Sequence, residues 1–417
     1  MKIQMKKMMR EGNCASFIFF FELEADDKTE AISYNAGRAN IFLGPRSCTF
    51  DFPFDVAIPH PDLVCMAALK IVSPYIGSRV IMDRPVSKSF ATAVKDRYIN
   101  IKTINTSSLL PRIAHGEKYA VSFSGGADSL AAANICPPGT PLILSARKFH
   151  PEVGVFEPWF KTEGNIATLR DMPDTFVKIC VISDFEFLST NHSYCIYPDN
   201  YAFTIPCILL ADHLGLTGIF TGDIFAAFSG DEMRKFSMLN FDKMAEYYRS
   251  VGIDFDSPVK GVTELGTEII NRYYKNDANA TTCQYGTYKK PCMQCIKCFR
   301  KSFIKAYLSK KVLPDNIIER FNNSKAVIKF RNNIDNGNMR LRLTFKEILK
   351  DVDTSHYENI DVVKKACQDI TFDTAFINNL FLYPYKSIKN SFTMQYCINE
   401  LMKIFETMSD EDENKFL

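Results

Sequence analysis

The sequence lacks any apolar segment that approaches the roughly 20 residues of a membrane-spanning helix. The apolar run Phe17–Phe21 is too short for the hydrophobic region of a secretory signal peptide, and acidic residues follow it from Glu22 onwards. Internal repeats and low-complexity tracts are missing as well. We therefore expect a cytoplasmic globular protein without a membrane partner.

The chain also has little excess charge of either sign. Its 50 Lys and Arg residues and 48 Asp and Glu residues leave a formal net charge of +2. Apart from a mild cluster at Lys2–Arg10, the basic residues are spread along the chain, which argues against a dedicated nucleic-acid surface. Its 417 residues, 46% of them hydrophobic, suffice for two or three domains with a sizeable core.

The lysine-containing phosphate loop of kinases and GTPases, Gly-x-x-x-x-Gly-Lys-Ser/Thr, is absent too. A different glycine-rich stretch, Tyr119–Ser129, reads Tyr-Ala-Val-Ser-Phe-Ser-Gly-Gly-Ala-Asp-Ser. Its first half is typical of a buried parallel strand. Ser124–Gly126 then offers backbone amides with little side-chain bulk, and a helix expected over 130–134 adds its N-terminal partial charge. The pattern predicts a phosphate-binding turn, and a glycine-rich turn without a ligand is the alternative.

The region around this turn alternates between strand and helix patterns from residue 116 to about residue 300. Such alternation predicts an α/β fold with a parallel sheet and helical crossovers. Further strands are expected over 141–146, 176–183 and 218–221, and a helix over 201–214. Ligands of open parallel sheets bind at the carboxyl ends of strands. The turn should therefore share one rim with Ser145–Lys148, Ser183–Asp184 and Gly222–Asp223.

Two further regions flank this core. Residues 1–115 carry mixed patterns and are interpreted as an N-terminal α+β domain. Its strands are expected over 16–23 and 46–50, and its helices over 61–72 and 87–96. Residues 301–417 are interpreted as a helical C-terminal region. Its helices are expected over 301–309, 315–321, 345–351, 361–370 and 393–407.

Thirteen cysteines in a cytosolic chain indicate metal binding or catalysis before disulfides. Nine are scattered, and several of these stand among apolar residues as small hydrophobes would. The other four, Cys283, Cys292, Cys295 and Cys298, follow the spacing Cys-x8-Cys-x2-Cys-x2-Cys. Four thiolates can close a tetrahedron around structural Zn²⁺. An iron–sulfur cluster and a redox-active pair are the alternatives.

Two motifs carry a resemblance to known enzymes. Ser124-Gly-Gly-Ala-Asp-Ser129 resembles the PP-loop of the N-type ATP pyrophosphatases, which cleave ATP between the α and β phosphates. Pro291-Cys-Met-Gln-Cys-Ile-Lys-Cys-Phe-Arg300 resembles the end of the zinc motif of the 7-cyano-7-deazaguanine synthase (QueC) family. The first gap between cysteines is longer here by one residue. Tyr197–Asn200 and Ser257–Ile270 agree with that family as well, so the resemblance covers about residues 116–301.

The resemblance implies a set of ligands and site residues. ATP with Mg²⁺ would bind through the amides of Gly125 and Gly126 and the hydroxyls of Ser124 and Ser129, with Asp128 directed at the metal ion. The implied catalytic residues are Ser124, Asp128 and Ser129. The implied nucleotide-binding residues are Ser122, Ser124, Gly125, Gly126, Ala127, Asp128, Ser129, Ser145 and Gly222. The implied contacts to a deazaguanine base are Asn200, Asp223, Ser229 and Asp231.

The chain also departs from the family pattern. Family members usually begin almost at the PP-loop, Asp199 stands where a basic residue is expected, and the segment after Gly230 differs. Long QueC-like proteins occur in bacterial antiphage operons, which implies a ligase that joins 7-carboxy-7-deazaguanine to an amine of a protein partner. The alternatives are an ammonia-using synthase, a PP-loop tRNA sulfurtransferase and an inactive scaffold. A homodimer is compatible with each.

Overall fold

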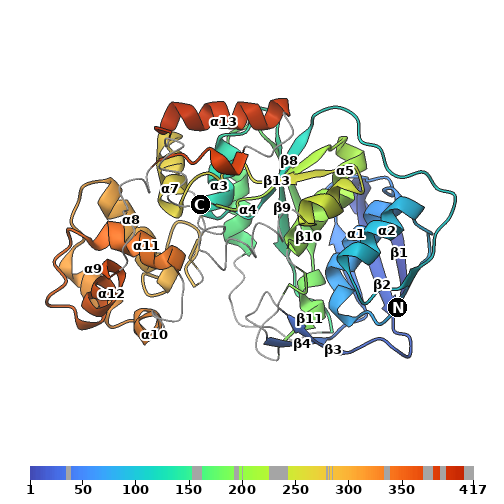
Figure 1. Ribbon diagram of the computed structural model, residues 1–417, viewed down its shortest axis with the longest axis horizontal. Coiled ribbons are helices and arrows are strands. Elements are labelled where there is room, and N and C mark those ends of the chain that lie inside the picture. Colours follow the sequence, from blue (N-terminus) through green and yellow to red (C-terminus); the bar gives the residue numbers. More distant parts are fainter. Residues whose placement is uncertain are drawn as a thin grey trace.

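A computed structural model gives the fold (Figure 1). It describes residues 1–33, 39–152, 162–191, 197–199, 201–224, 243–278, 280, 282–283, 285–332, 339–369, 379–385 and 391–407. The statements below concern these residues. Within them, no helix is both long enough and apolar enough to cross a membrane.

A ten-stranded mixed sheet with mostly parallel neighbours organises the molecule, in the order β13-β12-β8-β9-β10-β5-β2-β1-β6-β7. Its central strands are β8 (Tyr119–Phe123), β9 (Pro141–Arg147), β10 (Val177–Ser183), β12 (Gly218–Phe220) and β13 (Asp254–Asp256). All four pairings among these strands are parallel. The expected parallel sheet is therefore confirmed for this region.

The N-terminal strands continue this sheet. They are β1 (Lys2–Arg10), β2 (Cys14–Glu22), β5 (Ser47–Asp51), β6 (Arg79–Met82) and β7 (Thr103–Ile104). The junction is the antiparallel pair β5–β10, in which Asp51 lies opposite Ile182. Strands β3 (Glu30–Ser33), β4 (Ala39–Leu43) and β11 (Ser189–Thr190) form a small second sheet. Residues 1–115 thus supply α+β structure that shares its main sheet with the core, while the three-part domain division stays a prediction.

Helices cover both faces of the sheet. Figure 1 shows α1 (Pro61–Val72) and α5 (Ile205–Leu214) between β8–β10 and the N-terminal strands, with α2 (Lys88–Arg97) nearby. On the opposite face lie α3 (Ala127–Asn134), α4 (Thr162–Arg170), α7 (Glu264–Tyr273) and α13 (Phe392–Ile404). Successive side chains of β8 point to opposite faces of the sheet. Ala120 packs in the core on the α1 and α5 side, whereas Val121 and Phe123 pack in the core on the α3 side.

The C-terminal helices divide into two groups. A helical lobe contains α8 (Ile296–Leu308), α9 (Asp315–Asn322), α10 (Lys325–Asn332), α11 (Met339–Leu349) and α12 (Glu358–Gln368). Its own core includes Phe299, Phe303 and Phe345. Helix α13 instead returns to the sheet, where Met394 and Leu401 pack with the α3 core. Helical structure in this region is confirmed, and α10 is an addition to the expected set.

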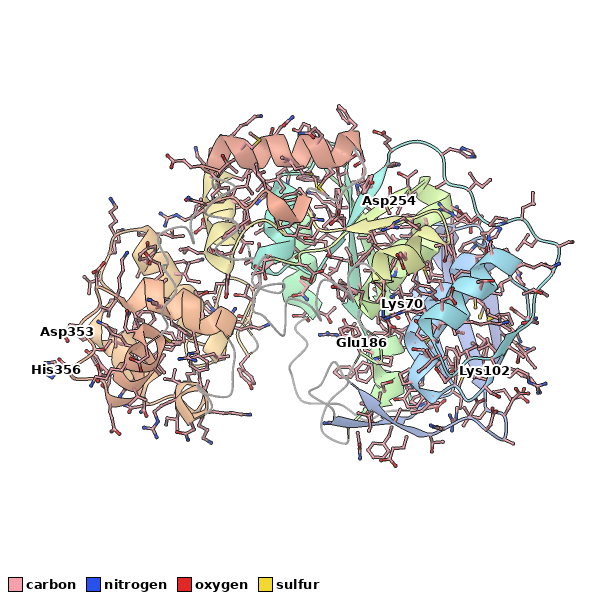
Figure 2. The ribbon with its side chains drawn as sticks, in the orientation of Figure 1. Lys70, Lys102, Glu186, Asp254, Asp353 and His356 are labelled. Carbon is pink, nitrogen blue, oxygen red and sulfur yellow. The ribbon has the colours of Figure 1, made fainter. Side chains whose placement is uncertain are left out.

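A buried ion cluster joins the N-terminal segment to the core. Lys70 of α1 lies inside the molecule (Figure 2), and its Nζ is 3.0 Å from Oδ1 of Asp199. Arg97 of α2 lies 3.7 Å from the other carboxylate oxygen, and the Tyr98 hydroxyl donates to it at 3.1 Å. Burial lowers the pKa of Lys70, and the Asp199 carboxylate opposes that shift. The resemblance predicted a basic residue at position 199. The structure instead has an aspartate there, whose negative charge is balanced by Lys70 and Arg97.

Candidate functional site

The turn after β8 is organised by its own hydroxyl groups. The Ser124 and Ser129 oxygens lie 2.9 Å apart, and the Ser129 hydroxyl donates to the Gly126 carbonyl at 3.1 Å. The amides of Ser124 and Gly126 donate to the hydroxyls of Ser129 and Ser124. The two serines therefore fix the turn, and Gly126 immediately precedes the first residue of α3. This is the strand–turn–helix context that phosphate-binding motifs require.

Two glycines allow backbone segments to approach closely here. Gly125 has φ +73°, a left-handed conformation that favours glycine. At Gly222, just beyond β12, an added Cβ would lie 2.7 Å from the Ser129 nitrogen. Gly222 thus lets the end of β12 touch the first turn of α3. The structure brings Gly222 together with Asp128 and Ser129, as the sequence predicted.

Helix α7 supports α3 from the side away from the sheet. Its Asn271 donates from Nδ2 to the Ala127 carbonyl at 2.9 Å, and its Thr267 hydroxyl donates to Oδ1 of Asp128 at 2.9 Å. Asp128 is half-buried, and the bond from Thr267 orients one oxygen of its carboxylate. A carboxylate oxygen fixed in this way is a suitable Mg²⁺ ligand.

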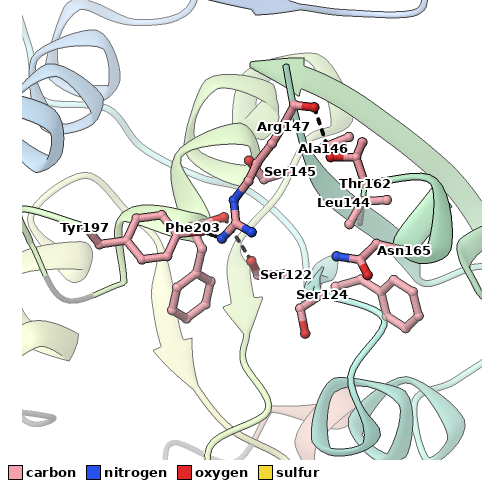
Figure 3. A pocket seen from close by; sticks show the side chains of 11 residues that line it. Ser122, Ser124, Leu144, Ser145, Ala146, Arg147, Thr162, Asn165, Tyr197 and Phe203 are labelled. Carbon is pink, nitrogen blue, oxygen red and sulfur yellow. Dashed lines mark hydrogen bonds between the residues drawn. The ribbon is translucent and has the colours of Figure 1, made fainter. Parts of the chain in front are cut away.

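A pocket of about 450 Å³, partly open to solvent, lies beside the turn (Figure 3). Its lining comes from β8, the turn, β9, α4 and the segment before α5, namely Ser122, Phe123, Ser124, Leu144, Ser145, Ala146, Arg147, Thr162, Asn165, Tyr197 and Phe203. Three predicted nucleotide-binding residues, Ser122, Ser124 and Ser145, therefore line one pocket. None of these described lining residues is acidic, which suits an anionic ligand.

Arg147, at the end of β9, lies in the predicted rim segment 145–148, but it was not among the predicted binding residues. Its Nε donates to the Glu186 carboxylate, and its terminal nitrogen lies 3.4 Å from the Tyr197 hydroxyl. Tyr197 in turn donates to Glu186 at 2.7 Å. The neighbouring Glu186 carboxylate raises the pKa of Arg147 against the effect of burial, so the guanidinium is charged. Only its position after a rim strand hinted at this role.

The predicted base-binding residues are only partly described. Asp223 accepts a hydrogen bond from the Thr221 hydroxyl at 2.5 Å, and its backbone carbonyl accepts one from Ser257 at 2.7 Å. The Asp223 carboxylate and burial together raise the pKa of Tyr201. Tyr201 has φ +64°, a left-handed backbone conformation that is uncommon for a tyrosine. Asn200, Ser229 and Asp231 lie outside the described residues.

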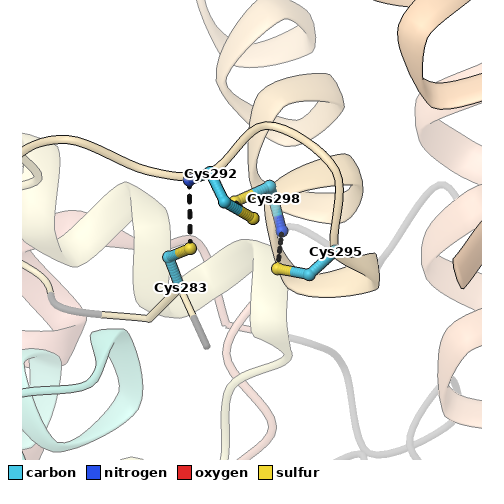
Figure 4. Close-up of side chains that lie close together, drawn as sticks. All are labelled: Cys283, Cys292, Cys295 and Cys298. Carbon is cyan, nitrogen blue, oxygen red and sulfur yellow. Dashed lines mark hydrogen bonds between the residues drawn. The ribbon is translucent and has the colours of Figure 1, made fainter. Parts of the chain in front are cut away.

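The four predicted metal ligands converge just before and within the first turn of α8 (Figure 4). All four sulfurs lie within 4.8 Å of one another, and those of Cys292 and Cys298 are 3.8 Å apart. Two zinc–sulfur bonds of about 2.3 Å at a tetrahedral angle separate the sulfurs by about 3.8 Å. The amides of Gly286 and Cys292 donate to the Cys283 sulfur at 3.0 and 3.2 Å and hold it toward the other three sulfurs. The cluster could thus hold a metal ion such as Zn²⁺.

Charged side chains connect the cysteine cluster to α7. Lys301 of α8 places Nζ 2.7 Å from Glu268 and 3.5 Å from Glu264, and Arg300 pairs with Glu264. Both glutamates are buried. Because α7 also holds Asp128, the cysteine cluster, α8, α7 and α3 form one continuous chain of contacts. Metal binding at the cysteines should therefore stabilise the support of the phosphate turn.

Comparison with known proteins adds one match. Residues 243–417 match the model of DUF6395, a family of unknown function. The match begins after the phosphate turn, covers less than half of the chain, and includes α7, the cysteine cluster and the helical lobe. The chain matches no curated protein. The function must accordingly be argued from the site.

The contact at Gly222 yields a first prediction. Gly222→Ala should displace the first turn of α3, because overpacking against backbone costs about 1–3 kcal/mol. We expect ATP affinity, measured by isothermal titration calorimetry, to fall about tenfold. Gly44→Ala is the matched control, since its Cβ would lie 3.6 Å from the nearest atom, at ordinary contact distance. Equal affinities of the two variants would contradict the proposed role of this contact.

The cysteine geometry yields a second prediction. The purified protein should contain one zinc ion per chain by elemental analysis, and Cys295→Ser should lose it. The variant should be less stable by about 4 kcal/mol or more in chemical denaturation, because a structural metal contributes folding free energy. Cys14→Ser, which changes a free cysteine elsewhere, should keep both zinc and stability. Bound iron with a visible absorption band would contradict the zinc assignment.

Proposed function

We propose that this protein is a PP-loop ATP pyrophosphatase that activates a carboxylate as its adenylate. The observation that carries the proposal is the turn at Ser124–Gly126, fixed by two hydroxyls, open to the N-terminus of α3 and adjoining a pocket without acidic lining residues. The resemblance of this lysine-free turn to the PP-loop implies a nucleotide that is cleaved between its α and β phosphates. The resemblance to N-type ATP pyrophosphatases supports the same assignment.

We propose that the turn binds the phosphates of the nucleotide and that the pocket binds its adenosine part. The triphosphate would lie over the Gly125 and Gly126 amides, where the α3 dipole favours negative charge. Its oxygens would replace the hydrogen bonds that the Gly126 amide and the two serine hydroxyls make within the turn. The adenosine part would occupy the pocket along β9. Asp128 would hold Mg²⁺, which offsets the charge of the departing pyrophosphate. Positioning and electrostatic stabilisation then supply most of the catalysis.

The acceptor is proposed from the resemblance to the QueC family. An oxygen of the 7-carboxy-7-deazaguanine carboxylate attacks the α-phosphorus, and pyrophosphate leaves. An amine nitrogen then attacks the activated carbonyl carbon, AMP leaves and the amine loses a proton, which gives an amide. Of the predicted base-binding residues, Asp223 is the one that the structure describes. Its carboxylate is proposed to accept hydrogen bonds from the donors on the guanine-like edge of the deazaguanine. Its carboxylate is oriented for this role by Thr221.

The amine is proposed to belong to a protein partner. An adenylate hydrolyses readily, so the site must exclude water and present the amine at attack distance. Ammonia needs only a narrow entry, whereas a polypeptide needs a longer surface. The N-terminal strands and the α8–α12 lobe, which the shorter family members lack, are material for such a surface. The same features favour a partner-modifying ligase over an ammonia-using synthase.

Product analysis tests this function. Incubation with ATP, Mg²⁺, 7-carboxy-7-deazaguanine and the proteins encoded by neighbouring genes should release AMP and pyrophosphate. Intact-mass spectrometry should show one partner heavier by the deazaguanine acyl group, and Asp128→Ala should abolish both results. Formation of ADP and orthophosphate would contradict the pyrophosphatase assignment. A nitrile formed from ammonia, with no partner adduct, would identify the synthase instead.

A further inference from the structure

We propose that Arg147 is a specificity-determining residue that binds the α-phosphate of the nucleotide. This inference rests on the proposed function and assigns the pocket's charged side chain to one group of the substrate. It follows from the position of Arg147, from the way its side chain is held and from the charge of its surroundings.

The position of Arg147 is set by the pairing of two strands. Phe123 of β8 lies opposite Leu144 of β9, so both chains leave the sheet at the same edge. Ser124 begins the phosphate turn there, and Arg147 ends β9. Figure 3 shows the guanidinium directed toward the middle of the pocket, on the side of Ser122 and Ser124. A ligand that spans the turn and the pocket must pass this group.

The Arg147 side chain is held before any ligand arrives. Glu186, which is buried, accepts from its Nε, and Tyr197 contacts both the guanidinium and Glu186. The Thr162 hydroxyl donates to the Arg147 carbonyl at 3.0 Å and fixes the backbone. The side chain nevertheless stays 26% exposed. An arginine held in this way loses little conformational entropy when it binds an anion.

The charge around Arg147 selects an anion. Of the described residues that line the pocket, Arg147 is the one with a charged side chain. The next residue, Lys148, does not line the pocket and instead places its Nζ 2.6 Å from Asp51. The lining also includes Ser122 and Ser124 from the nucleotide-binding strand and turn, but not Thr221 or Asp223. The anion that meets Arg147 is therefore a phosphate of the nucleotide rather than the carboxylate of the acceptor.

The α-phosphate is the phosphate that joins the two parts of the site. The turn would bind the β and γ phosphates and the pocket would bind adenosine, so the α-phosphate lies between them. Negative charge increases on its oxygens as the acceptor carboxylate attacks. A planar guanidinium can donate to two of these oxygens at once. The same contact would reduce the repulsion between the attacking carboxylate and ATP.

Calorimetric titration with AMP and with adenosine isolates this contact. The wild-type protein should bind AMP more tightly than adenosine, and Arg147→Gln should weaken AMP binding by about tenfold to a hundredfold. Its adenosine affinity should stay unchanged. Lys148→Gln, which removes the adjacent charge, should keep the wild-type preference for AMP.

A paired variant covers the case in which Arg147→Gln leaves Glu186 buried without its cation and fails to fold. Arg147→Gln combined with Glu186→Gln removes one charge of each sign, so the net charge is unchanged. It should show the same selective loss of AMP affinity. Loss of adenosine and AMP binding to the same degree, or an unchanged preference for AMP, would overturn the proposal.

The outcome is separable from that of the proposed function. If the wild-type protein releases pyrophosphate but the paired variant keeps its preference for AMP, the Arg147 inference fails while the function stands. If no pyrophosphate is released and AMP binding still depends on Arg147, the inference stands and the function fails. Weaker binding of 7-carboxy-7-deazaguanine alone would assign Arg147 to the acceptor and overturn the α-phosphate contact.

Discussion

The packing of the first turn of α3 is the constraint on which the rest of the site depends. A ligand must reach its amides, and at Gly126 it must replace the hydrogen bond that the amide donates to the Ser124 hydroxyl. Ser124 and Ser129 fix the turn internally, Gly222 touches it without a side chain, and Asn271 holds it from α7. Within the turn Ser124 is exposed and Gly126 is half-buried, whereas Gly125 is buried. This arrangement provides backbone donors at a helix N-terminus, the chemistry on which anion binding relies.

The cysteine cluster supports the same turn from a distance, through α8 and α7. Helix α7 touches Asp128 at one end of a charged network, and α8 carries Arg300 and Lys301 at the other. Breaking a buried ion pair by removing one partner typically costs about 3–5 kcal/mol. Buried Glu264 and Glu268 thus tie the position of α7 to that of α8, whose N-cap is Cys295 and whose first turn contains Cys298. A metal far from the phosphates would then support their binding through helix position.

Local patterns predicted the glycine-rich turn between β8 and α3, the cysteine cluster and most helices, because each depends on residues close together in sequence. Helix α1 begins and ends where its apolar face and Pro61 indicated. Long-range pairing could not be predicted. The union of β5 with β10 depends on residues 131 positions apart, Asp51 and Ile182. Strand β1 was missed because its outer face is lysine-rich, and Arg147 acquires its role only when β9 pairs with β8.

The central claim is that an acceptor carboxylate attacks the α-phosphorus of ATP. Transfer of isotope tests this most directly. The acceptor 7-carboxy-7-deazaguanine is labelled with ¹⁸O in its carboxylate and incubated with the protein, Mg²⁺, ATP and the amine partner. The AMP formed should carry one labelled oxygen, because the attacked phosphorus keeps the carboxylate oxygen when the amide forms. AMP without label, or nucleotide released as ADP, would contradict the account.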